Sequence, residues 1–184
     1  MAKKVVIILA EGFEEIEAIT PIDVLRRAGV DLIIAGVGSK TIKGAHGIVF
    51  QTDITLDELK NLPDAIILPG GLPGAANLQK SEKVKELVKK MDAQKKLIGA
   101  ICAAPALVLA PAGVLNGRKA TCYPGFEKNF SNKITFSLDR VIKDGHIITS
   151  RGPGSAMEFS LELVAQLVSP AKAEELRAGM LAKV

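Results

Sequence analysis

Five short apolar runs, rich in β-branched residues, recur along the chain with amphipathic segments between most of them. The runs cover residues 5–9, 32–37, 65–68, 97–101 and 147–149. Short apolar runs of this kind are typical of strands that are buried on both faces. Their alternation with helical segments predicts an α/β fold, in which a mostly parallel sheet carries helices on both faces.

The segments between the first runs carry helix signals. Residues 14–27 predict a helix with a kink at Pro21 and a stop at Gly29. Residues 83–91 place apolar side chains at intervals of three and four, which predicts a helix that packs on the sheet.

The last third of the chain predicts an edge of the sheet and two more helices. Short strands are expected between residues 119 and 149, with a hairpin turn at 143–145, as antiparallel additions at one sheet edge. Residues 155–158 have the spacing of a capping box before a helix that runs to residue 167. Residues 169–170 predict the cap and the first turn of a final helix.

Composition sets limits on the class of protein. A chain of 184 residues, 48% of them hydrophobic, predicts one domain over residues 1–184. The 24 basic residues are interspersed with 20 acidic ones, so neither nucleic acid nor a membrane surface is an expected partner. No apolar stretch approaches the roughly 20 residues that span a bilayer. The two cysteines fit neither a disulfide framework nor a zinc site, so we predict no metal and a reducing, cytoplasmic location.

Cys102 is the strongest candidate for chemistry. It follows the apolar run 97–101 and precedes a helical segment, which places its thiol in a sharp turn at the carboxyl edge of the sheet. The start of the following helix would favour the thiolate over the thiol. The alternative interpretation is a small, inert core residue, because free cysteines are commonly buried.

Two glycines follow another strand that ends at this edge. The backbone N–H groups of Gly70 and Gly71 are expected to approach a small ligand and to donate to a developing oxyanion, with Ala103 N–H as a further donor. A tight turn would explain the glycine pair equally well. No Gly-Lys-Ser/Thr follows, so a phosphate loop is excluded.

Glu17 is the candidate proton carrier. If it faces Cys102, the two groups should share a proton, with the glutamate protonated. Acidic residues are also favoured at a helix start by the dipole alone, and that is the alternative. A Cys-His-acid triad is not expected, because neither His46 nor His146 directly follows the cysteine. Cys122 is interpreted as structural, and the alternative is that it approaches the site together with Tyr123.

Several motifs occur in the order found in the ThiJ/PfpI superfamily, and the resemblance extends from the first strand to the last helix. They are Glu-Gly-Phe-Glu-Glu-Ile-Glu-Ala at 11–18, Pro-Ile-Asp-Val-Leu-Arg-Arg-Ala-Gly at 21–29, Leu-Pro-Gly-Gly at 68–71, Ala-Ile-Cys-Ala-Ala-Pro at 100–105 and Thr-Ser-Arg-Gly-Pro-Gly at 149–154. The chain resembles the Parkinsonism-associated deglycase branch most. The resemblance implies a flavodoxin-like three-layer sandwich, a homodimer, and a cysteine that is readily oxidised to sulfinic acid.

The resemblance also implies roles for individual residues. Cys102 matches the nucleophile and Glu17 its protonated partner, while Gly70, Gly71 and Ala103 match the oxyanion region. A secondary site is implied at three further positions. Arg27 and His46 fall where the branch has two arginines near the dimer interface and an anion site, and Tyr123 falls where it often has an active-site histidine.

Two of these positions depart from the family pattern. A histidine at position 46 should hold an anion less well than arginine, because imidazole is only partly charged at neutral pH. Tyr123 lacks a group that titrates near pH 7, which should affect the turnover rate. Ala103 stands where the peptidase-like branch has histidine, so proteolysis is disfavoured.

The first functional hypothesis is a cofactor-independent glyoxalase or deglycase. It would act on 2-oxoaldehydes such as methylglyoxal, or on their adducts, and would yield lactate through attack by Cys102. The alternative is an oxidative-stress sensor with holding-chaperone activity, in which oxidation of Cys102 is the functional event. A weaker alternative is a role in thiazole biosynthesis, which the missing phosphate loop does not support.

Overall fold

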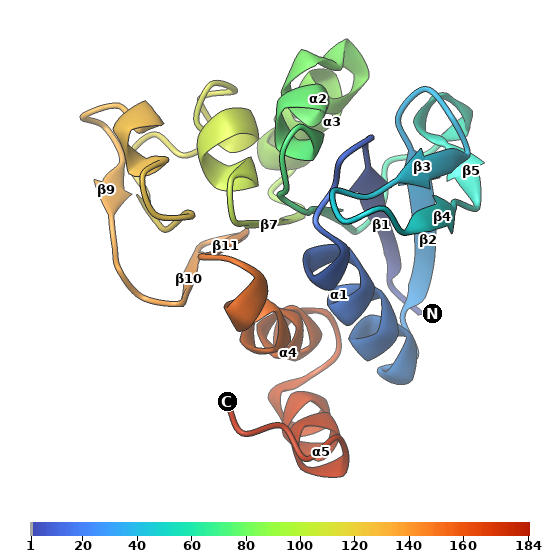
Figure 1. Cartoon of the computed structure of the whole chain (residues 1–184). Helices are drawn as coiled ribbons and strands as arrows, with labels where there is room; N and C mark the ends of the chain where they lie inside the picture. The colour runs from blue at the N-terminus through green and yellow to red at the C-terminus, as the bar shows by residue number, and fades with distance from the viewer. Residues whose placement is uncertain (1) are drawn as a thin grey trace.

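A seven-stranded sheet forms the centre of the computed structural model, which describes residues 2–184 (Figure 1). In spatial order its strands are β10 (Val141–Asp144), β11 (Ile147–Ser150), β7 (Leu97–Ile101), β6 (Ala65–Leu68), β1 (Lys4–Leu9), β2 (Asp31–Gly36) and β5 (Ile54–Thr55). All neighbouring pairs are parallel except β10 and β11, which form an antiparallel hairpin at one edge. The predicted α/β class and the antiparallel edge hairpin are both confirmed.

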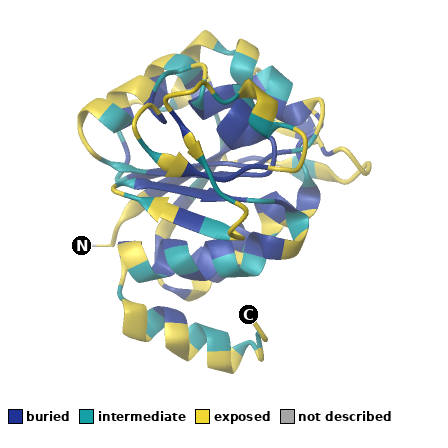
Figure 2. Cartoon of the chain, turned by 90° about the vertical axis from the view of Figure 1, so that its left-hand side faces the viewer, coloured by how far each residue is buried: buried dark blue, intermediate teal, exposed yellow. Residues whose placement is uncertain are grey.

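Helices cover both faces of this sheet. One face carries α1 (Glu15–Arg27) and α4 (Ala156–Leu167), and α5 (Pro170–Gly179) packs outside α4 (Figures 1 and 2). The other face carries α2 (Gly74–Lys80), α3 (Glu82–Ala93) and a π-helical segment, η2 (Pro105–Leu109). Short 3₁₀ turns complete the connections at η1 (Leu56–Glu58), η3 (Glu127–Asn129) and η4 (Pro153–Ser155). The result is a flavodoxin-like arrangement of three layers.

The alternation of side chains along β1 shows why two helical layers are needed. Val5, Ile7 and Leu9 are fully buried in the core under α1 and α4. Val6 and Ile8 point to the opposite face and are buried in the core under α2 and α3. Successive side chains of a strand alternate between faces, so a strand that is apolar at every position requires a cover on each side.

None of the helices within residues 2–184 combines the length and the apolar character that a bilayer crossing demands.

Two helix starts differ in their chemistry. Ser169 caps α5 as predicted, because its Oγ accepts a hydrogen bond from Lys172 N at 3.1 Å. The capping box predicted at Ser155 and Glu158 is wrong, although α4 begins where expected. Ser155 Oγ is held by the backbone of Gly152, and Glu158 instead binds Arg140 at 2.7 Å. A tertiary ion pair has replaced the local hydrogen bond.

Two pairs of short strands lie outside the main sheet. β3 (Thr41–Lys43) and β4 (Val49–Gln51) form an antiparallel hairpin beside the start of α1, which was not predicted. β8 (Lys119–Ala120) and β9 (Thr135–Phe136) pair with each other in parallel. Treating the whole of 119–149 as antiparallel edge strands was therefore wrong for β8 and β9. Strands of two or three residues are too short to show a period of two.

Substitution of Phe159 tests how much the packing between α4 and the sheet contributes to stability. Its ring is fully buried and lies against β7, where a Cβ added to Gly99 would meet Phe159 Cζ at 3.0 Å. We expect Phe159→Ala to lower the free energy of unfolding by about 3–5 kcal/mol, because it leaves a cavity at a site that cannot collapse. Urea denaturation followed by circular dichroism measures this. Phe159→Leu should cost clearly less, and equal losses would contradict the cavity explanation.

Candidate active site

Cys102 follows β7 directly and occupies a strained turn. Its φ is +65°, in the left-handed region that non-glycine residues seldom adopt. The turn is held by a hydrogen bond from Cys102 N to Ser150 O at 2.9 Å. The side chain is nearly buried, with 8% of the residue exposed. Strain of this kind at a turn between strand and helix is typical of a nucleophile aimed out of the sheet.

Glu17 lies in the first turn of α1 and is fully buried. Its Oε2 accepts a hydrogen bond from Gly70 N at 2.8 Å. Its Oε1 is also buried and has no hydrogen-bond partner within the part of the chain that the structure describes. A buried carboxyl group with a single donor is poorly stabilised as an anion.

Gly70 brings the thiol and the carboxyl group together. A Cβ added here would lie 2.6 Å from Cys102 Cβ, 2.7 Å from Glu17 Oε2 and 3.0 Å from Ala103 N. Three segments therefore converge on the space that a side chain at position 70 would fill. Gly71 is equally constrained, since its φ is +87° and a Cβ would overlap Glu14 N. The glycine pair is more than a tight turn, because the close approach of these groups depends on it.

Cys102 and Glu17 affect each other's ionisation. Burial raises the pKa of Glu17 to about 7, against the opposing effects of the Cys102 thiol and of Gly70 N–H. Burial and the charge of Glu17 raise the pKa of Cys102, although the N–H groups of Gly71 and Ala103 lower it. Two negative charges are not tolerated together, so at least one of the two groups keeps its proton near neutral pH.

The expectation that the following helix start would favour the thiolate is only partly met. Backbone N–H groups do face the sulfur of Cys102, yet burial outweighs them and raises the pKa of the thiol. A thiolate at this site needs the shared proton to reside on Glu17, because an ionised carboxylate would oppose it.

The backbone N–H groups of Gly70, Gly71 and Ala103, which the sequence predicts as oxyanion donors, do not all face the Cys102 sulfur. Gly70 N–H is already bound to Glu17, so it is not free to donate to a substrate. This corrects the expectation for Gly70. The N–H groups of Gly71 and Ala103 lie next to the Cys102 sulfur and remain suited to an oxyanion.

Tyr123 lies beside the candidate nucleophile. Its N–H donates to Cys102 O at 2.8 Å, and its ring packs on the backbone of Gly152. The residue is 44% exposed. Cys122, one residue earlier, is fully buried, in keeping with a structural role.

Arg27 is not brought to Cys102 within one chain. It is the last residue of α1, ten residues or about 15 Å along the helix from Glu17. Its Nε donates to Asp23 at 2.7 Å and its side chain is 54% exposed. The secondary site implied for Arg27, His46 and Tyr123 near a dimer interface stays a prediction.

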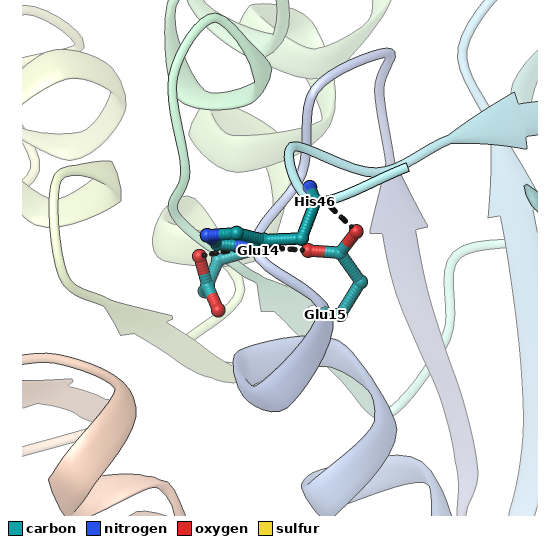
Figure 3. Close-up of side chains that lie close together, drawn as sticks. All are labelled: Glu14, Glu15 and His46. Carbon is teal, nitrogen blue, oxygen red and sulfur yellow. Dashed lines mark hydrogen bonds and ion pairs between the residues drawn. The ribbon is translucent and has the colours of Figure 1, made fainter. Parts of the chain in front are cut away.

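His46 instead meets two acidic residues at the start of α1 (Figure 3). Its Nδ1 lies 2.9 Å from Glu15 Oε2 and 3.4 Å from Glu14 Oε2. The hydrogen bond to Glu15 and the charges of both carboxylates raise the pKa of His46, so this histidine is more cationic than an isolated one. Sequence reasoning treated Glu14 and Glu15 only as helix-start acids, and no spacing signal connects them to residue 46.

A mostly parallel sheet covered by helices, with a strained cysteine at its carboxyl edge and a buried glutamic acid beside it, defines a class of cysteine-centred flavodoxin-like proteins. The chain belongs to the DJ-1/PfpI family, whose family model matches residues 3–166.

Known relatives agree with this assignment. Protein DJ-1 homolog B of Arabidopsis thaliana is 45% identical over 176 residues, which cover 95% of this chain and 40% of the relative. Glutathione-independent glyoxalase DJR-1.2 of Caenorhabditis elegans is 38% identical, over 90% of this chain and 89% of that protein. The crystal structure of Drosophila melanogaster DJ-1beta matches with a TM-score of 0.94 and 38% identity, and each chain is covered completely. The chain thus spans less than half the length of the Arabidopsis relative.

The raised pKa of Glu17 predicts a pH dependence of stability. A group whose pKa rises from 4.5 when unfolded to about 7 when folded binds its proton more tightly in the folded state. Its stabilising contribution, at most about 3 kcal/mol, is complete below pH 4.5 and is lost as the pH rises through 7. We expect the free energy of unfolding to fall between pH 5 and pH 8 relative to that of Glu17→Gln, as measured by urea denaturation. Parallel pH profiles for the two proteins would contradict the buried, protonated carboxyl group.

Proposed function

We propose that the chain is a cofactor-independent glyoxalase that converts 2-oxoaldehydes such as methylglyoxal to hydroxy acids, or releases them from glycated groups. One observation carries this proposal. The strained Cys102 and the buried Glu17, whose pKa is about 7, both lie close to the Cα of Gly70. A nucleophile beside a group that can both give and take a proton is what an internal redox reaction of an oxoaldehyde needs.

Two further observations support this substrate class. Only 8% of Cys102 is exposed, so the sulfur is accessible to small reagents rather than to a folded polypeptide. The C. elegans relative is named a glutathione-independent glyoxalase, and it is 38% identical along most of both chains. Direct use of the protein's own thiol in place of glutathione agrees with the arrangement of Cys102 and Glu17.

The proposed reaction begins with attack of Cys102 Sγ on the aldehyde carbon of methylglyoxal. The aldehyde oxygen takes up a proton, and a hemithioacetal forms. Glu17 then removes the proton from this carbon and returns a proton to the neighbouring carbonyl carbon. The hydroxyl proton passes from the first oxygen to the oxygen of that neighbour, so the adduct becomes a lactoyl thioester. Water hydrolyses the thioester, so lactate leaves and the thiol is restored. No external oxidant is needed, because one carbon is oxidised while its neighbour is reduced.

Backbone N–H groups supply the electrostatic part of the proposal. Negative charge develops on oxygen during the attack and again during hydrolysis. The N–H groups of Gly71 and Ala103, which face the Cys102 sulfur, are the donors we assign to that oxygen. Gly70 positions Glu17 instead, through the hydrogen bond of 2.8 Å to Oε2.

Conversion of methylglyoxal to lactate without glutathione tests the proposal. We expect Cys102→Ala to lower turnover by about 10³-fold or more, because the nucleophile is lost. Glu17→Gln should lower it by about 10²- to 10⁴-fold, because the amide cannot transfer protons. Cys122→Ala is the matched control, since it removes the other thiol and should leave kcat close to that of the parent. Lactate is measured enzymatically and the fold by circular dichroism.

Equal inactivity of the parent and of all variants would contradict the glyoxalase proposal. The second candidate function, a cysteine-based oxidative-stress sensor, would then be favoured. Its support is the pair of N–H groups facing Cys102 Sγ, which are suited to the oxygens of a sulfinate as well as to an oxyanion.

We also propose that the chain forms a homodimer through an exposed apolar surface at the start of α1 and on the neighbouring hairpin. The surface consists of Ile16, Ile19, Ile48 and Val49, each between 38% and 60% exposed. Ile16 and Ile19 are three residues apart and share a helix face. Ile48 N donates to Glu15 Oε1 at 3.3 Å, which places the hairpin against the first turn of α1. Adjacent exposed apolar side chains of this size mark a protein interface.

Val49→Asp tests the homodimer. A charge in an apolar interface should shift the chain toward the monomer. The dissociation constant of the dimer should become at least tenfold larger. Sedimentation velocity over a range of concentrations measures this. Leu138→Asp is the control, because Leu138 is 74% exposed but lies in the loop between β9 and β10. A dimer that survives Val49→Asp unchanged would rule out this surface.

A further inference from the structure

The hairpin loop between β3 and β4 is built around the carboxylate of Glu15. His46 N and Ile48 N donate to Glu15 Oε1 at 2.8 and 3.3 Å, and Ala45 N donates to Phe13 O at 2.8 Å. Gly44 has no side chain, and a Cβ there would overlap the Glu15 carboxylate. The loop thus encloses a carboxylate that is 94% buried.

This arrangement brings three potential metal ligands together. The ligand atoms of Glu14, Glu15 and His46 all lie within 4.8 Å of one another (Figure 3). Nδ1 of His46 faces both carboxylates, at 2.9 and 3.4 Å. Metal–ligand bonds of about 2.1 Å at tetrahedral angles place two zinc ligands about 3.4 Å apart, so small side-chain shifts would make room for an ion.

Within one chain, the charges in this cluster do not balance. Among residues 2–184, His46 is the only cationic side chain within ion-pair distance of either carboxylate. One imidazolium offsets one of two negative charges, and the start of α1 contributes only a fraction of a charge. Both carboxylates are largely withdrawn from solvent, with 12% and 6% of their side chains exposed. A divalent cation in place of the imidazole proton would balance both charges.

We propose that Glu14, Glu15 and His46 form a site for a divalent cation of the zinc class, with water as the remaining ligand. One imidazole nitrogen and two carboxylate oxygens are donors that suit Zn²⁺ or Co²⁺ better than Ca²⁺ or Mg²⁺, which prefer oxygen alone. Binding at Nδ1 releases the proton that this nitrogen holds. The site is separate from Cys102 and Glu17, and its occupation does not depend on the glyoxalase proposal.

Titration of ZnCl₂ into the full chain tests this site. The titration is performed in a Cys102→Ser background, so that the thiol cannot contribute a ligand and the protein is inactive. Isothermal calorimetry should show one Zn²⁺ per chain, and Co²⁺ should give the visible absorption of a four-coordinate site. Adding His46→Gln should weaken Zn²⁺ binding at least tenfold, because an amide does not replace the imidazole nitrogen.

The second histidine provides a matched control. His146 is paired with Asp92 at 2.8 Å and lies at the turn between β10 and β11. His146→Gln in the same background should leave Zn²⁺ affinity unchanged. His46 is 69% exposed, so its substitution should leave the circular dichroism spectrum unaltered. Absence of binding in the Cys102→Ser parent, or equal affinity with and without His46, would overturn the proposal.

Discussion

The hydrogen bond from Gly70 N to Glu17 Oε2 joins the parts of the molecule on which the candidate active site depends. It connects the loop after β6 to the first turn of α1, and the turn after β7 packs on the same glycine. These segments come from β1, β6 and β7, which are neighbours and parallel, so their carboxyl ends lie at one edge of the sheet. A side chain at position 70 would separate the thiol from the carboxyl group.

The burial of Glu17 decides how its carboxyl group ionises. Glu17 has one donor on Oε2 and none on Oε1 within the described chain, and its pKa is raised to about 7. In water the same carboxyl group would be ionised and would repel a thiolate. Inside the protein, with its pKa near 7, it is protonated in part of the molecules at neutral pH, and this is the form that the proposed reaction of Cys102 requires. The core packing of α1 is therefore part of the proposed chemistry, because it withdraws Glu17 from solvent.

The acidic start of α1 has two separate roles that the sequence does not distinguish. Glu17 faces inward toward Cys102, whereas Glu14 and Glu15 face the hairpin of β3 and β4. Backbone N–H groups anchor two of these carboxyl groups: Gly70 N donates to Glu17, and His46 N and Ile48 N donate to Glu15. Burial raises the pKa of Glu17 to about 7, whereas the hydrogen bonds from His46 and Ile48 lower the pKa of Glu15 against the opposing effect of burial. All three residues are glutamates, so their surroundings decide which role each one has.

Much of this protein follows from its sequence, because the relevant signals are local. Apolar runs such as 65–68 specify buried strands, and Ser169 specifies the start of α5 through a hydrogen bond three residues away. Cys102 was recognisable because a strand, a turn and a helix follow one another without interruption.

The tertiary structure decided the rest. The predicted capping box at Ser155 is wrong because Glu158 forms an ion pair with Arg140, which is distant in sequence. In the same way, only the folded chain decided that Gly70 binds Glu17 and that His46 meets Glu14 and Glu15. Local hydrogen bonds and hydrophobic periodicity are encoded by neighbours in sequence, whereas burial, pKa and convergent ligands arise only when distant segments pack together.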